Sequence, residues 1–97
     1  MKDIETIIKH YGMKNQLKKL HEEVYELTEA ILDCYNSEIP EEVLKENVTE
    51  EMADCFVLLN QFLIRFDLDT NEIDKVMDSK IERQLRRIEK EKELNNV

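Results

Sequence analysis

Two short acidic stretches carry the residue types best suited to chemistry. The first, HEEVYELTEA, contains Glu23 and Glu26, and the second, TEEMADCFVLL, contains Glu51 and Asp54. Residues three positions apart share one face of a helix, so each stretch can present two carboxylates side by side. Two such helices in contact would offer four oxygen ligands, which suit hard divalent cations: Mg²⁺, Mn²⁺ or Ca²⁺.

Two alternatives to this divalent-cation site are a solvated helix face and a di-iron centre. Glutamates at this spacing also line ordinary solvated helix faces. Asp54, however, opens a long apolar run, where an unpaired carboxylate is costly to bury and a bound cation would offset that cost. A ferritin-like di-iron centre needs Glu-x-x-His pairs, and neither His10 nor His21 follows a glutamate by three positions. His21 is interpreted as a surface or helix-flanking residue.

The elements that must position these acids are helices. The chain has 97 residues, 41% hydrophobic and 38% charged, with a single glycine and a single proline. These values predict one all-α domain over residues 1–97. The apolar spacing predicts four helices, at about residues 3–11, 14–35, 41–66 and 70–93.

Local residues predict where the helices begin and end. Gly12 is expected to end or kink the first helix, and Pro40 suits the first turn of the third. Asn47 or Thr49 is expected to cap the main part of the third helix. Asp69 is expected to be the N-cap of the fourth, with Glu72 completing a capping box.

The third helix is unusually apolar. Between residues 52 and 66 the only charged side chains are those of Asp54 and Arg65, so apolar groups surround nearly the whole helix. Such a helix is buried on most sides. A short four-helix chain cannot cover it alone, which predicts a four-helix bundle-like protomer completed by homo-oligomerisation, as a dimer or a larger assembly.

The charge limits the classes of partner. A net charge of −9 and a sequence pI of about 4.7 predict repulsion from nucleic acid and from anionic lipid. No apolar run approaches 18 residues, and MKDIETIIKH lacks a signal-peptide core. Cys34 and Cys55 are interpreted as reduced, buried thiols. We expect a soluble, cytoplasmic protein with no nucleic acid polymer and no membrane among its partners.

A basic segment near the C-terminus is the best candidate for holding phosphate. KIERQLRRIEK places Lys80, Gln84 and Arg87 on one helix face. The alternative is that these cations interact with the helix dipole and with nearby glutamates. The sequence offers no evident nucleophilic side chain, so a hydrolase of this kind would use water activated by a metal or a carboxylate.

Taken together, these motifs resemble the MazG-like all-α nucleoside triphosphate pyrophosphohydrolases. The segments LHEEVYELTEAI and VTEEMADCFVLLNQF look like the two metal-binding helices of that family. LDTNEIDKVMDSKIERQLRR is similar to its closing helix, and the likeness spans about residues 17–87. The family carries a Lys-x-x-x-Asn-x-x-Arg pattern in that helix, where this chain has Gln84 in place of the asparagine.

The resemblance implies a role for each matching residue. It implies Mg²⁺ ligands, with Mn²⁺ as a substitute, at Glu23, Glu26, Glu51 and Asp54. Supporting roles at most fall to Glu22 and Glu50, and contacts with the triphosphate fall to Lys80, Gln84 and Arg87. It also implies that Glu23 or Glu26 positions or deprotonates the attacking water.

The implied reaction is hydrolysis of a (deoxy)nucleoside triphosphate between its α and β phosphates, giving the monophosphate and pyrophosphate. The family further implies a dimer or a dimer of dimers. Two other readings stay open: a non-catalytic helical dimer acting as an adaptor or antitoxin-like module, and a pyrophosphohydrolase acting on phosphoribosyl-ATP. The sequence leaves the base preference open.

Overall fold

The structure, a computed structural model, describes residues 2–96 and is helical throughout, with no strand in this range. The elements are α1 (Lys2–Tyr11), α2 (Met13–Leu32), the short 3₁₀ helix η1 (Asp33–Tyr35), α3 (Glu41–Arg65) and α4 (Thr70–Asn95). The predicted all-α class with four long helices is confirmed. The main difference is that α2 ends at Leu32 and its predicted last turn is 3₁₀. No helix among the described residues is long and apolar enough to cross a membrane.

Gly12 separates α1 from α2, as predicted. Its φ of +84° lies in a region that L-residues with a side chain rarely adopt. Its backbone N–H donates to the carbonyl oxygen of Ile8 at 2.9 Å, which closes the last turn of α1. The chain therefore changes direction at the one residue type that accepts this conformation without strain.

The predicted internal cap of α3 is wrong. The helix runs without interruption from Glu41, directly after Pro40. The Thr49 hydroxyl donates to the carbonyl oxygen of Lys45 at 2.7 Å, a bond back along the same helix. Thr49 therefore lies inside the helix, and its hydroxyl does not act as an N-cap. No cap at Asn47 is needed either.

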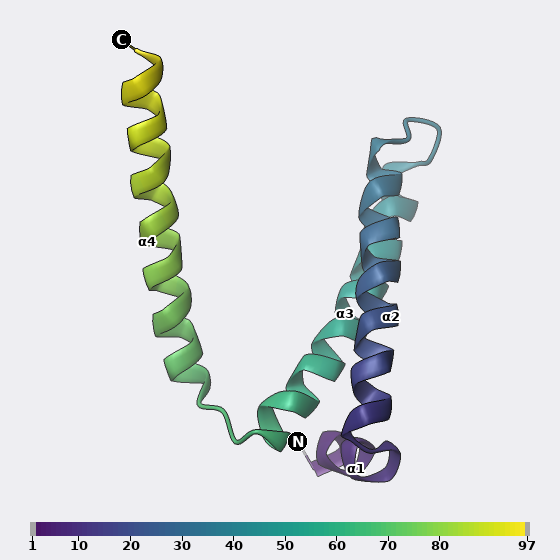
Figure 1. Cartoon of the computed structure of the whole chain (residues 1–97). Helices are drawn as coiled ribbons and strands as arrows, with labels where there is room; N and C mark the ends of the chain where they lie inside the picture. Colours follow the sequence, from purple (N-terminus) through teal and green to yellow (C-terminus); the bar gives the residue numbers. More distant parts are fainter. Residues whose placement is uncertain (1, 97) are drawn as a thin grey trace. The chain divides into compact units, whose positions relative to one another are not determined.

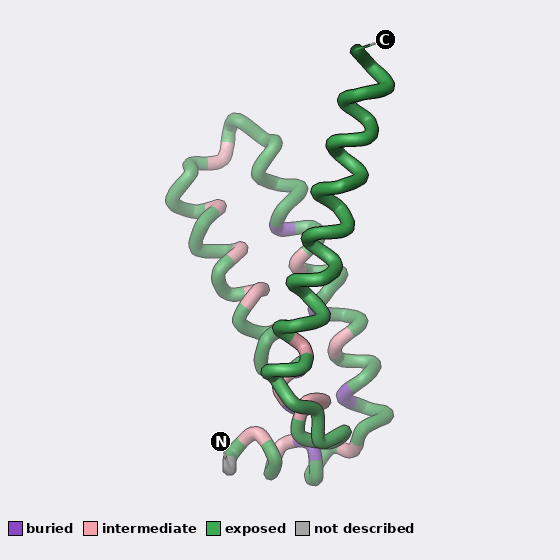
Figure 2. Tube along the Cα trace, turned by 90° about the vertical axis from the view of Figure 1, so that its left-hand side faces the viewer, coloured by how far each residue is buried: buried purple, intermediate pink, exposed green. Residues whose placement is uncertain are grey.

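Residues 2–66 form one packed unit. In Figure 1, α2 and α3 lie side by side and run in opposite directions, joined by η1 and the loop at residues 36–40. α1 packs at the end of this hairpin and contacts α3 more extensively than α2. Figure 2 shows how sparse the buried positions are. The buried apolar residues are Ile8, Ala30, Cys55 and Leu58, and the buried polar residues are Gln16, Glu23 and Gln61. Cys55 is thus buried as predicted, whereas the predicted burial of Cys34 is wrong, because this residue lies exposed in η1, between α2 and α3.

Within the unit formed by residues 2–66, much of the apolar surface of α3 is uncovered. Phe56 is 56% exposed, Leu59 46% and Val57 43%. A small domain normally buries side chains of this kind, because each contributes stability in proportion to the apolar area removed from water. The partner copy inferred from the sequence would cover them, and it stays a prediction.

The remaining residues form a second unit, consisting of the turn after Phe66 and α4. The carboxylate of Asp69 accepts a hydrogen bond from the backbone N–H of Asn71 at 2.9 Å, so the predicted N-cap is confirmed. Glu72 does not show the predicted capping-box bond among the described contacts, and its side chain instead lies 3.4 Å from the Lys75 ammonium. α4 carries an exposed apolar stripe: Val76, Met77, Ile81, Leu85 and Ile88.

Candidate metal centre

The packing of α2 on α3 brings three carboxylates together. Glu23 comes from α2, while Glu51 and Asp54 lie one turn apart on α3. Each contributes one oxygen atom to a group in which all the atoms lie within 4.8 Å of one another. Three of the four predicted metal ligands are therefore neighbours in space, although the sequence separates Glu23 from the other two by more than 25 positions.

Two oxygens of this group are buried without a hydrogen-bond partner. They are the Oε2 atoms of Glu23 and Glu51. Glu23 is only 6% exposed, and its other oxygen, Oε1, lies 3.1 Å from the Nζ atom of Lys19. Asp54 is exposed and opens the group to solvent. Buried polar atoms almost always have a partner, so these two oxygens indicate a missing cation or proton.

The charges of the group act on the acid–base properties of its members. Burial raises the pKa of Glu51 above its usual value of 4.5, and the neighbouring charges of Glu26, Glu23 and Asp54 raise it further. The pKa of Lys19 is raised by its hydrogen bond to Glu23 and by the negative charge of that residue. Burial of Glu51 and, after it, repulsion among the carboxylates are therefore the main causes that favour a proton or a cation at this site.

The fourth predicted ligand, Glu26, lies at the edge of the site. It is exposed and is outside the closely spaced group. Its charge nevertheless helps to raise the pKa of Glu51, which shows that the two carboxyl groups interact. Of the supporting acids, Glu22 lies 4.0 Å from the Lys19 ammonium, and Glu50 is exposed.

A pocket of about 430 Å³ adjoins the carboxylates, and Glu23 and Asp54 form part of its wall. Its other lining residues are Ile7, Gln16, Lys19, Val57, Leu58 and Gln61. The amide nitrogen of Gln16 donates to the amide oxygen of Gln61 at 2.9 Å. The sequence reasoning missed Gln16, Lys19 and Gln61. Two signals in the sequence could have found them: Lys19 stands four residues before Glu23, and Gln61 is one of two adjacent amides, with Asn60, in an apolar run.

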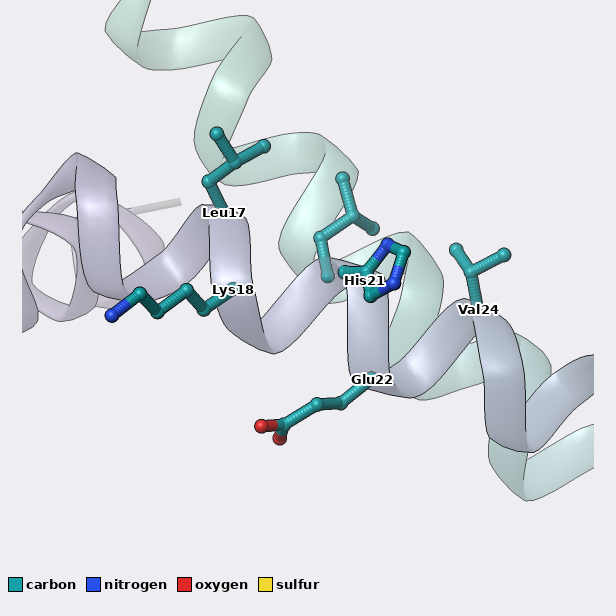
Figure 3. Close-up of a pocket in the computed structure, with 6 residues that line it drawn as sticks. Leu17, Lys18, His21, Glu22 and Val24 are labelled. Atoms are coloured by element: carbon teal, nitrogen blue, oxygen red, sulfur yellow. The ribbon is translucent and has the colours of Figure 1, made fainter.

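A second groove runs along α2, away from the carboxylate group. In Figure 3, Leu17, His21 and Val24 project from one side of the helix, while Lys18 and Glu22 project from another. His21 is exposed, in agreement with its interpretation as a surface residue. Glu22 lines this groove and is outside the closely spaced carboxylate group.

The predicted phosphate contacts lie on α4, where all three side chains are exposed. Lys80 lines a small surface depression together with Arg83 and Arg86. Gln84 and Arg87 do not line it. Of the three predicted phosphate contacts, the depression thus contains only Lys80. The role of Lys80, Gln84 and Arg87 in binding substrate stays a prediction.

No protein-family model matches the chain, and comparisons with curated proteins and with solved structures found no match either.

Proposed function

We propose that this chain is a divalent-cation-dependent nucleoside triphosphate pyrophosphohydrolase of the MazG-like all-α type. The observation that carries the proposal is the pair of buried Oε2 atoms, on Glu23 and Glu51, which lack a partner beside Asp54. A cation would satisfy both atoms and relieve the repulsion that raises the pKa of Glu51.

The donor set fits Mg²⁺, with Mn²⁺ as a substitute. All the candidate ligands are carboxylate oxygens: Glu23, Glu51 and Asp54, joined by Glu26 after a change of side-chain rotamer. The nearest soft donor is Cys55, which is buried. Burial and then the charges of the carboxylates raise the pKa of the Cys55 thiol, so it stays protonated and is a poor competitor for the ion.

The proposed reaction is attack of water on the α-phosphorus of a nucleoside triphosphate. The bond from this phosphorus to the bridging oxygen breaks, and the two outer phosphates leave as pyrophosphate. Glu26 is exposed at the edge of the site and accepts the proton of the water, whereas Glu23 is enclosed and paired with Lys19. Glu23, Glu51 and Asp54 would hold Mg²⁺, which would supply positive charge to neutralise the phosphates.

Phosphate contacts and self-association complete the proposal. Lys80, Gln84 and Arg87, exposed on α4, bind the triphosphate. A second copy of the chain covers the exposed apolar side chains of α3, giving a dimer or a dimer of dimers. The net charge of −9 makes cation-assisted binding of a small polyanion more favourable than binding of a nucleic acid polymer.

The test is pyrophosphate release from a panel of ribo- and deoxyribonucleoside triphosphates. We expect release with Mg²⁺ or Mn²⁺, none with EDTA, and a loss of at least about a hundredfold in kcat/KM for Glu51→Gln. Glu50→Gln is the matched control, because it removes the same charge from an exposed neighbouring position. Full activity of Glu51→Gln at limiting Mg²⁺ would exclude α3 as a metal-binding helix.

The alternative function is a non-catalytic helical interaction module. The exposed apolar residues of α3, such as Phe56 and Leu59, favour this reading, because they fit a protein partner without any metal. It predicts no pyrophosphate release from any nucleotide, and little effect of Glu23→Gln or Glu51→Gln beyond a change in solubility.

A further inference from the structure

The pocket beside the carboxylates contains an unusual polar feature. Gln61 is the most enclosed large side chain among the described residues, at 1% exposed, and Gln16 is 8% exposed. Their amide groups bond to each other among Ile7, Val57 and Leu58. Only four apolar residues of the described chain are buried, so two buried amides are a large polar fraction of a very small core.

Such a pair contributes little to the stability of the fold. One hydrogen bond between side chains yields only about 1 kcal/mol net, and replacing both partners by apolar groups of similar shape is often neutral. Stability alone therefore does not account for the pair, and its remaining amide atoms are suited to bonding a ligand. The bond between the two amides engages the Nε2 atom of Gln16 and the Oε1 atom of Gln61, and not their other amide atoms. Those other atoms are an acceptor on Gln16 and a donor on Gln61, and both residues line the same pocket.

We propose that this pocket binds the base of the nucleotide and that Gln16 and Gln61 recognise its hydrogen-bonding edge. This inference rests on the proposed function. A nucleobase presents adjacent donors and acceptors on a flat ring, and the pocket offers amides for the edge and Ile7, Val57 and Leu58 for the faces. Its volume of about 430 Å³ lies within the range of small-molecule sites, roughly 300–1,000 Å³.

The position of the pocket relative to the acids supports this assignment. Glu23 and Asp54 belong both to the carboxylate group and to the pocket wall. A nucleotide whose phosphates are held at the acids therefore has its nucleoside end directed along the same wall, toward Gln16 and Gln61. Lys19 also lines the pocket, and its ammonium is 3.1 Å from Glu23, between the two regions.

The experiment compares the wild type with the double variant Gln16→Leu/Gln61→Leu. Two quantities are measured: the ratios of kcat/KM across a panel of nucleoside triphosphates, and the inhibition constant of inorganic tripolyphosphate, which has no base. Calorimetric binding of non-hydrolysable α,β-imido nucleotides gives a readout that does not depend on turnover. Asn15→Leu is the matched control, since Asn15 is an exposed amide outside the pocket, bonded to the Tyr11 carbonyl.

We expect the double variant to keep its helical content and its tripolyphosphate inhibition. The ratio between the best and the worst nucleotide should fall by roughly tenfold or more, because a site that reads a base through hydrogen bonds discriminates strongly. Asn15→Leu should keep the wild-type ratios. If the double variant fails to fold, Gln61→Glu is tested instead. It keeps an oxygen that can accept from Gln16, and it should reorder the preferred bases because it replaces the remaining donor of Gln61 with an acceptor.

Unchanged ratios in a folded variant would overturn this inference and leave the proposed hydrolase intact. An equal loss for every nucleotide and for tripolyphosphate would also overturn it, because that result indicates a purely structural role for the amides. Absence of pyrophosphate release by the wild type with Mg²⁺ and Mn²⁺ would overturn the proposed function itself, and the inference with it.

Discussion

At the residue scale, the carboxylate group is expected to destabilise the fold without a cation and to stabilise it when a cation is bound. Without one, Glu51 is held beside Glu23 and Asp54, which repel it. We therefore expect Glu51→Gln to raise the Tm of the cation-free protein and to abolish the rise in Tm that Mg²⁺ gives the wild type. Calorimetry with and without MgCl₂ measures both effects. Glu50→Gln should behave as the wild type, and an undiminished Mg²⁺ response in Glu51→Gln would contradict the assignment.

The same residue makes stability depend on pH. The folded protein holds the Glu51 proton more tightly than the unfolded chain does, since its pKa is raised above 4.5. The resulting stabilisation is complete below 4.5 and is lost as the pH rises through the raised folded-state pKa. In cation-free buffer, lowering the pH from 7 toward this pKa should raise the Tm of the wild type relative to that of Glu51→Gln. Parallel Tm curves for the two proteins would exclude this effect.

How far the site could be predicted depended on the kind of signal that each residue gives. Glu23, Glu51 and Asp54 were found because the spacing of three positions reports a shared helix face. Gln16 and Gln61 were missed because a neutral amide gives no such signal. The burial of each amide depends on a contact between two residues that are 45 positions apart in the sequence. No local pattern encodes such a contact.

At the scale of the elements, the start of α4 depends on a single side chain. The Asp69 carboxylate accepts a hydrogen bond from the Asn71 N–H, and removing this carboxylate leaves an unpaired donor in the first turn. We expect Asp69→Ala to destabilise this turn by about 1 kcal/mol. Hydrogen exchange at residues 70–73 should accelerate accordingly, while Asp74→Ala, inside the helix, should leave these rates near the wild-type values. Equal acceleration in both variants would show that the cap is not responsible.

The boundaries of helices were predicted where one residue decides them and not where several compete. Gly12 and Asp69 were recognised because a positive φ and an N-cap each demand particular residue types. Thr49 was misread as a cap because threonine also bonds backward within a helix, and the choice depends on whether the preceding turn is helical.

At the scale of the whole molecule, the apolar residues of α3 predict self-association. Leu59→Glu or Phe56→Glu places a charge on a surface that a second copy would cover. We expect the wild type to have at least twice the 11.6 kDa mass of one chain by light scattering, and these variants to shift toward the single-chain mass. Asn95→Glu, exposed at the end of α4, is the control. A monomeric wild type at high concentration would refute the predicted oligomer.

The number of helices followed from composition and periodicity, whereas the covering of α3 did not. Periodicity predicts which face of a helix is apolar, but it does not predict what packs against that face. The sequence predicts that α3 needs cover, and Phe56 is half exposed in the unit formed by residues 2–66. The identity of the cover is a property of the assembly, which a single sequence does not contain.

The conformation of Gly12 has a consequence for chirality. At φ +84° and ψ 152°, this residue occupies a region that suits a D-amino acid better than an L-amino acid. An added β-carbon would meet no atom within 4 Å, so handedness alone decides the outcome. In a chemically synthesised chain, D-alanine at position 12 should therefore stiffen the unfolded state and stabilise the protein, while L-alanine at the same position should destabilise it.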